Sequence, residues 1–196
     1  MSGFDLVSRV FGILLGLATA EVLKGFARVW RIRQGAETLE TPMRIGWLVP
    51  LLGILIVLDQ ITFWFKFAEL GPHLPVDMFG LSGMIAVIGA YYGLSTFVFP
   101  PEMKQWPDFD EYYFQVRTVV IGGLLAINFM VLGYQIGLMA VGVELPDDPS
   151  SSSIPAGIEV FGVTALFALL FTRSVRANMV LLIIANVATL ASDLPF

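Results

Sequence analysis

Residues 51–65 read LLGILIVLDQITFWF, an apolar run with an aspartate at its ninth position and a glutamine directly after it. The run belongs to a longer apolar segment, residues 45–67, which exceeds the roughly 20 helical residues needed to cross a hydrocarbon core. Inside a bilayer only helices and closed barrels satisfy all of their backbone hydrogen bonds. The segment therefore predicts a membrane-spanning helix, and it raises the question of why Asp59 and Gln60 lie within it.

The composition of the whole chain agrees with this class. Of its 196 residues, 57% are hydrophobic and only 14% are charged, whereas soluble domains have about 25% charged residues. We therefore predict an all-α, polytopic membrane protein that folds as a single transmembrane helical domain over residues 1–196. The lipid bilayer is its expected partner, and the net charge of −5 gives no indication of nucleic-acid binding.

The chain has no cysteine and a single histidine, His73. Disulfides, iron–sulfur clusters and thiolate chemistry are therefore excluded. A zinc site of the usual nitrogen and sulfur type, or a haem between two histidines of one chain, is excluded as well. A bound metal would have to be a hard cation held by oxygen ligands. We expect no cofactor and no metal.

Further segments along the chain are long and apolar enough to cross a bilayer. The fifth of them is short and contains Glu159, and the sixth contains Asn178 and Asn186. We predict a bundle of six transmembrane helices near residues 6–25, 45–67, 78–99, 118–143, 156–172 and 177–194.

Basic residues are distributed unevenly over the predicted connections. Nine of the eleven Lys and Arg fall after spans 1, 3 and 5, and only Arg9 and Lys66 fall on the other side. The positive-inside rule then places these three connections in the cytoplasm and both termini on the non-cytoplasmic side, most simply of the plasma membrane. The acidic segment 144–155, ELPDDPSSSSIP, is predicted to be a mobile outside loop. The nine residues are Lys24, Arg28, Arg31, Arg33, Arg44, Lys104, Arg117, Arg173 and Arg176.

The N-terminal segment also has features of a signal peptide. Residues 10–20, VFGILLGLATA, resemble the apolar core and the A-x-A end of a signal peptide. In the stretch before them the negative charge of Asp5 offsets the positive charge of Arg9, so the positive n-region of a signal peptide is missing. A retained first span is the prediction that follows.

Asp59 lies about 5 Å from the midpoint of its span, and an isolated charge there costs at least about 2.5 kcal/mol. The carboxylate must therefore be neutral, paired or exposed to a wet cavity. Lys66, seven residues later, shares its helix face but lies about 10 Å higher. We predict that Arg9 of the antiparallel first span pairs with Asp59. Such a pair would either lock two helices together or take part in transport.

Four further polar residues lie within predicted spans. Glu21 has Lys24 and Arg28 on its side of the helix, which favours an interfacial ion pair over a functional carboxylate. Asn128 and Gln135 are seven residues apart and share one face, while Asn186 is central in the last span. Hydrogen bonds between helices, or the lining of a polar pore, would both use such amides.

The second basic connection also carries acidic residues. Residues 100–117, PPEMKQWPDFDEYYFQVR, contain Glu102, Asp108, Asp110 and Glu111. Asp108 followed by Glu111 resembles a capping box, so we expect the fourth helix to begin there and to pair with the basic residues after span 1. A hard-cation site is the alternative, although the spacing of a calcium loop is missing.

Small residues recur at four-residue spacing in three pairs. Such pairs allow close helix packing, either inside one bundle or between copies of the chain in a dimer. The sequence shows no repeat between its two halves that would indicate a transporter of the inverted-repeat type. The pairs are Gly12/Gly16, Gly89/Gly93 and Gly133/Gly137.

The sequence does not reveal the biochemical activity. Motifs of zinc proteases, serine hydrolases, P-loops, dinucleotide-binding folds and K⁺ filters are absent, which argues against an enzyme without excluding one. The intramembrane carboxylates and amides favour a small transporter or channel-like protein. The alternative is an accessory or structural subunit that packs in a homo-oligomer or a larger membrane complex. Convergence of these polar residues on one water-accessible cavity would favour transport.

Overall fold

The computed structural model of the protein describes residues 3–35, 44–70, 78–102, 106–140, 142 and 153–192. These residues form an all-α structure, and among them the only β-type pairing is an isolated bridge between Arg44 and Asp108. The helices described are α1 (Gly3–Arg33), α2 (Leu48–Leu70), α3 (Met78–Val98), α4 (Phe109–Ala140), α5 (Ser153–Phe171) and α6 (Val175–Ser192).

Five of these helices, α1, α2, α3, α4 and α6, are long and apolar enough to cross a membrane. The apolar part of α5, Gly157–Phe171, is shorter. With about 1.5 Å of rise per residue, the 19 residues of α5 extend about 28 Å. Apolar helices of this number and length are compatible with the membrane protein that the composition predicted.

Helix boundaries differ from the prediction mainly at the basic connections. α1 continues to Arg33, so Lys24, Arg28 and Arg31 are helical residues instead of loop residues. α4 begins at Phe109, as the Asp108 motif predicted, and the Asp108 carboxylate accepts a hydrogen bond of 2.8 Å from the backbone N–H of Asp110. An aspartate at this position satisfies a backbone donor that has no partner within its own helix.

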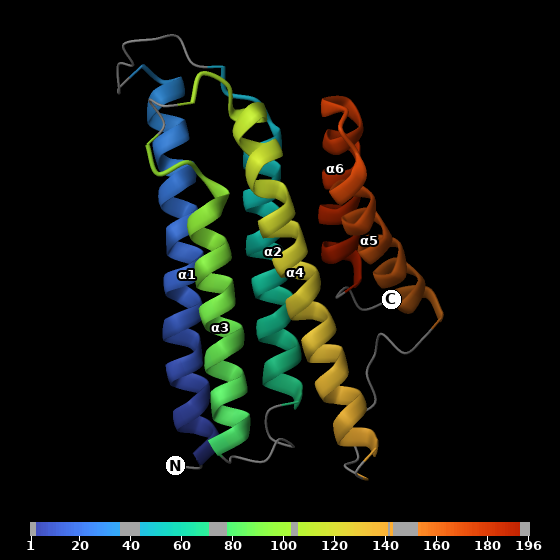
Figure 1. Cartoon of the computed structure of the whole chain (residues 1–196). Helices are drawn as coiled ribbons and strands as arrows, with labels where there is room; N and C mark the ends of the chain where they lie inside the picture. Colours follow the sequence, from blue (N-terminus) through green and yellow to red (C-terminus); the bar gives the residue numbers. More distant parts are fainter. Residues whose placement is uncertain are drawn as a thin grey trace.

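The helices are arranged as three neighbouring pairs (Figure 1). α1 packs against α3 on one side of the molecule, α5 packs against α6 on the other, and α2 and α4 lie between them. The chain turns between α1 and α2, α3 and α4, and α5 and α6 lie at one end, which we call the basic end. Arg28, Arg33, Arg44, Arg173 and Arg176 lie near these turns, so the basic connections share one end as predicted.

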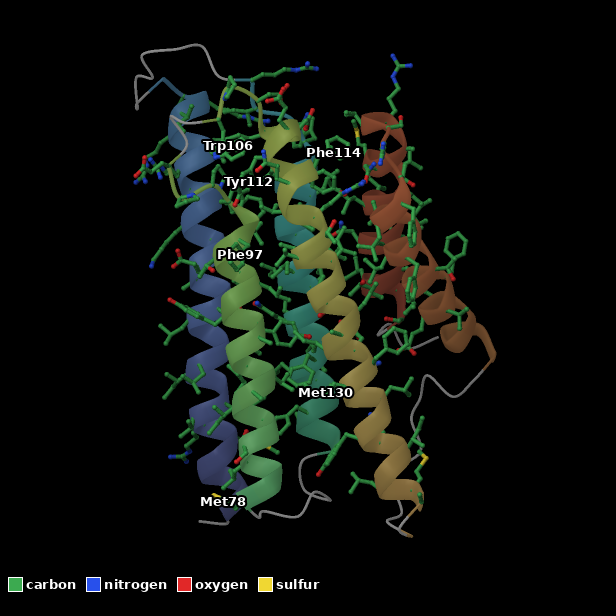
Figure 2. All side chains as sticks on the ribbon, viewed as in Figure 1. Met78, Phe97, Trp106, Tyr112, Phe114 and Met130 are labelled. Carbon is green, nitrogen blue, oxygen red and sulfur yellow. The ribbon has the colours of Figure 1, made fainter. Side chains whose placement is uncertain are left out.

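Aromatic contacts occur towards both ends of the bundle, and Figure 2 labels those near the basic end. At the basic end Trp106 and Tyr112 meet edge to face, with ring centroids 5.1 Å apart, and the Tyr112 hydroxyl donates to the Phe97 carbonyl oxygen at 2.8 Å. Towards the opposite end the Phe11 ring of α1 stacks on the Phe67 ring of α2, with centroids 4.2 Å apart. These contacts fix the register of α1 against α2 and of α3 against α4.

Most of the glycines at which the chain packs closely differ from those in the predicted small-residue pairs. A Cβ atom on Gly25 would lie 2.1 Å from the Phe99 ring, and one on Gly123 would lie 2.4 Å from Leu94. Of the predicted pairs, only Gly12 has a described neighbour, Trp64, at 3.1 Å from such a Cβ. For the other five predicted glycines, a Cβ atom would have no described atom within 4 Å. These are Gly16, Gly89, Gly93, Gly133 and Gly137. Packing inside the bundle therefore accounts for Gly12 alone.

Candidate functional site

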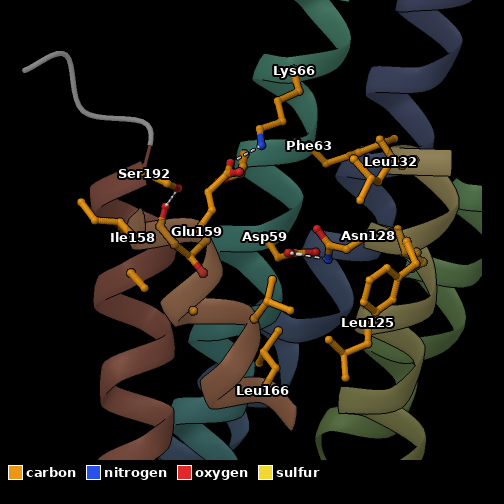
Figure 3. A pocket seen from close by; sticks show the side chains of 18 of the residues that line it. Asp59, Phe63, Lys66, Leu125, Asn128, Leu132, Ile158, Glu159, Leu166 and Ser192 are labelled. Atoms are coloured by element: carbon orange, nitrogen blue, oxygen red, sulfur yellow. Dashed lines mark hydrogen bonds and ion pairs between the residues drawn. The ribbon is translucent and has the colours of Figure 1, made fainter. Parts of the chain in front are cut away.

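A cavity of about 270 Å³ lies among α2, α4, α5 and α6, and Tyr91 of α3 reaches its wall. We call it the polar cavity, because both charged and uncharged polar side chains line it (Figure 3). Its described polar residues are Asp59, Thr62, Lys66, Tyr91, Asn128, Gln135, Glu159, Thr189 and Ser192.

Helical spacing explains why α2 and α4 contribute to the same cavity. Asp59, Thr62 and Lys66 follow one another at three and four residues, so they share one face of α2. Asn128 and Gln135 are seven residues apart and share one face of α4, as predicted, and both line the cavity. The two helices therefore present their polar faces to the same space.

The Asp59 carboxylate joins three helices. The Tyr91 hydroxyl of α3 donates a hydrogen bond of 2.6 Å to its Oδ2, and the Asn128 amide of α4 donates one of 3.3 Å to its Oδ1. The Asn128 amide also donates to the Leu124 carbonyl oxygen at 3.0 Å, which fixes the orientation of that side chain.

A pair of opposite charges also lies on the cavity wall, between α2 and α5. The Lys66 ammonium is 2.6 Å from the Glu159 carboxylate, and the two side chains are 32% and 36% exposed. Sequence reasoning had considered Lys66 only as a distant partner of Asp59, and Glu159 only as an interruption of a short span. A sequence signal for this pair does exist. Lys66 and Glu159 have opposite charges, and each lies in the predicted non-cytoplasmic half of its span, 45–67 or 156–172.

The predicted pair between Arg9 and Asp59 does not fit the register of α1 against α2. Thr19 donates a hydrogen bond of 2.7 Å to the Gln60 side-chain oxygen, so Thr19 is the α1 residue at the depth of Asp59. Arg9 lies ten residues earlier, about 15 Å away along the axis of α1. Its side chain is exposed near the end of α2 where Phe11 meets Phe67. The depth estimate failed because α1 extends beyond both of the predicted ends of its span.

Gln60, beside Asp59 in the sequence, has a different environment. It is 1% exposed, accepts the Thr19 hydroxyl and donates to the Ser95 hydroxyl at 2.9 Å. These contacts join α1, α2 and α3 outside the polar cavity. A step of one residue rotates the side chain by about 100° around the helix, which explains why Asp59 and Gln60 face different neighbours.

Two other predicted intramembrane residues lie away from the polar cavity. Glu21 pairs with Lys24 at 3.0 Å, so the predicted ion pair along α1 is confirmed. Asn186 of α6 donates to the Leu51 carbonyl oxygen of α2 at 3.2 Å, which is the predicted hydrogen bond between helices. Neither residue is part of the cavity wall.

Asp108 and Asp110, two of the acidic residues at the basic end, have structural contacts. Asp108 pairs with Arg44 at 3.7 Å, which confirms the expected pairing with the basic connection after α1. Asp110 is buried against Gly46, at the start of α2, while Glu102 and Glu111 are exposed. Within the residues described, no three Asp, Glu or His side chains are grouped as ligands of a metal ion. His73 and residues 144–152 lie outside the described residues.

A second buried polar group, which the sequence did not predict, joins α4 to the turn between α5 and α6. We call it the Arg117 network. Arg117 donates to the carbonyl oxygens of Leu169, at 3.1 Å, and of Thr172. Tyr113 donates to the Asn178 side-chain oxygen at 2.9 Å, and the Asn178 amide donates to the Thr172 and Ser174 carbonyl oxygens. The positive guanidinium thus satisfies carbonyl groups at the C-terminus of α5.

Between the polar cavity and the Arg117 network the bundle is filled with apolar side chains. Ile121, Leu124, Leu169 and Leu182 are fully buried there, and each lies nearer to the basic end than the cavity residues of its helix. The cavity is therefore closed towards the basic end. Its wall offers carboxylate, amide and hydroxyl groups to a small polar solute. Among family models, curated proteins and solved structures, none matches the chain.

Proposed function

We propose that this chain is a small membrane transport protein, a transporter or channel-like protein whose solute occupies the polar cavity. The observation that supports this function is convergence. Asp59, Asn128 and Gln135, all predicted from sequence, line one cavity together with Lys66 and Glu159. Charged side chains are costly at membrane depth, and where they occur together around a cavity they commonly belong to solute pathways.

We also propose how the chain lies in the membrane. All six helices cross the bilayer, including the short α5, and both termini lie on the non-cytoplasmic side of the plasma membrane. The supporting observation is that the turns rich in basic residues share one end of the bundle. In this orientation the polar cavity lies in the outer half of the bundle and is closed towards the cytoplasm.

The absence of native cysteine allows a direct test of this orientation. Single cysteines at Gln34 and Ser150 are treated with a maleimide that cannot cross membranes. We expect labelling of Ser150→Cys in intact cells and labelling of Gln34→Cys only after permeabilisation. The reverse pattern, or labelling of both positions in intact cells, would contradict the proposed topology.

The transport function is tested by solute flux. The full chain is reconstituted into vesicles of phosphatidylethanolamine and phosphatidylglycerol, and entry of methylammonium, glycerol, glycine and acetate is measured. We expect flux of at least one of these solutes, and a loss of about tenfold or more in Asp59→Asn, equivalent to about 1.4 kcal/mol of barrier. Glu21→Gln, which changes a carboxylate outside the cavity, is the matched control and should retain the flux.

A non-catalytic accessory subunit is the second candidate function. It is favoured by a specific observation, namely that both Asp59 oxygens accept hydrogen bonds from the protein itself. Folded protein that conducts none of the four solutes would contradict transport and favour this alternative. If Asp59→Asn lowered stability while flux remained unchanged, Asp59 would have a structural function only.

A further inference from the structure

We propose that the solute of the polar cavity carries a primary ammonium group, and that Lys66 occupies the place of this group on Glu159 when no solute is bound. The inference rests on the proposed transport function and names the class of its solute. Lys66 would then be a competitor that the protein carries within its own chain.

The charges of the cavity favour a cation. Its described wall contains two carboxylates, of Asp59 and Glu159, and one ammonium, of Lys66. The wall therefore has a formal charge of −1, and such a charge attracts a cation and repels an anion. The remaining polar groups are hydroxyls and amides, whose oxygens can accept hydrogen bonds from an ammonium.

The Lys66–Glu159 pair indicates which kind of cation the carboxylate holds. An ammonium lies 2.6 Å from the Glu159 Oε1 atom in the present structure, at the end of a flexible four-carbon stem. Both side chains are about one third exposed and line the polar cavity, so a solute in the cavity can reach the pair. Ion pairs with this exposure are weak, about 1 kcal/mol or less. A free amine can therefore displace Lys66 at moderate concentration.

Apolar side chains provide a surface for the alkyl part of such an amine. Phe63, Leu132 and Leu166 line the cavity beside Asp59 and Glu159 (Figure 3). A cavity that combines a few polar groups with apolar walls is typical of sites for small organic molecules. A bare metal ion fits less well, because the described residues contain no group of three metal-ligating side chains.

Equilibrium binding to the full chain in lipid nanodiscs provides the test. The probes are n-butylamine, which is an ammonium at neutral pH, n-butanol and butyrate, which have similar size and different charge. Empty nanodiscs correct for partition into lipid. We expect saturable binding of n-butylamine only. Equal binding of n-butanol, or tighter binding of butyrate, would overturn the proposal.

Variants of the ion pair test the competition by Lys66. If Lys66 occupies Glu159 about nine-tenths of the time, Lys66→Gln should bind n-butylamine about tenfold more tightly. Glu159→Gln should weaken binding by about tenfold or more, equivalent to about 1.4 kcal/mol. Lys24→Gln removes the lysine of the Glu21–Lys24 pair, outside the cavity, and should leave binding unchanged. Unchanged or weaker binding by folded Lys66→Gln would overturn the competition.

Two further measurements keep the inference testable if Lys66→Gln does not fold. The double variant Lys66→Gln/Glu159→Gln retains the formal charge of the wall, and it should bind as weakly as Glu159→Gln. Unchanged binding by either of these variants would contradict a role of Glu159. Amine binding without flux in vesicles would contradict the transport function but support an ammonium ligand. Flux of glycerol or acetate alone would contradict the ammonium class of solute.

Discussion

The polar cavity and the Arg117 network each contain polar side chains that join three or more helices, yet they differ in what satisfies those side chains. In the Arg117 network the main acceptors are backbone carbonyl oxygens of α5 and the following turn, which are fixed in place. In the polar cavity the charged groups of Asp59, Lys66 and Glu159 contact other side chains, which can rotate away. The first arrangement fixes a helix end, and the second leaves groups that a solute can engage.

The difference also lies in packing. The Arg117 network is separated from the cavity by fully buried side chains such as Leu169 and Leu182, and Arg117 itself is 8% exposed. The cavity residues Lys66 and Glu159 are several times more exposed. Polar residues of similar type therefore serve stability where the bundle is filled, and become available for binding where it is not.

The largest loss of stability is expected for a substitution that breaks the Arg117 network. Arg117→Met leaves carbonyl groups of Leu169 and Thr172 without their charged donor, and hydrogen bonds to charged groups contribute about 1.5–3 kcal/mol each. We expect a loss of about 3 kcal/mol in the free energy of unfolding, measured by SDS titration in mixed micelles. Arg176→Met, at an exposed arginine of the same end, is the control. A loss below about 1 kcal/mol for Arg117→Met would show that the network does not fix α5.

A smaller loss of stability is expected when a side chain is added at Gly25, where the basic end is tightly packed. Gly25→Ala places a Cβ atom 2.1 Å from the Phe99 ring, so the buried ring must move. Overpacking of this kind costs about 1–3 kcal/mol, and we expect a loss of about 2 kcal/mol in the same unfolding measurement. Gly133→Ala, which has no described atom within 4 Å, should be neutral or stabilising. Equal effects of the two substitutions would contradict the packing contrast.

The smallest effect concerns the cavity pair. In a double-mutant cycle of Lys66→Gln and Glu159→Gln, the coupling energy for unfolding should be about 0.5–1 kcal/mol, because the pair is partly exposed. The same micelle unfolding assay measures all four proteins of the cycle. A coupling above about 2 kcal/mol would mean that the pair is a structural lock like the Arg117 network.

The candidate site was predicted in part. The spacing of Asn128 and Gln135 correctly placed them on one face, because both lie within a regular helix whose period is known. The carboxylate of Asp59 was correctly identified as needing partners, but the partner named was wrong. Tyr91 could not be identified, because a tyrosine in a span is as readily explained by packing as by a hydrogen bond to a carboxylate.

The sequence by itself determined that this chain forms apolar helices joined by basic turns at one end, because helix length and hydropathy are local properties that a bilayer makes obligatory. Only the tertiary structure decided that Asp59 meets Tyr91 and Asn128 and that Lys66 meets Glu159. Such contacts depend on the axial register and rotation of one helix against another. A shift along an axis, such as the ten residues between Arg9 and Thr19, changes the partners of a side chain without changing any helix.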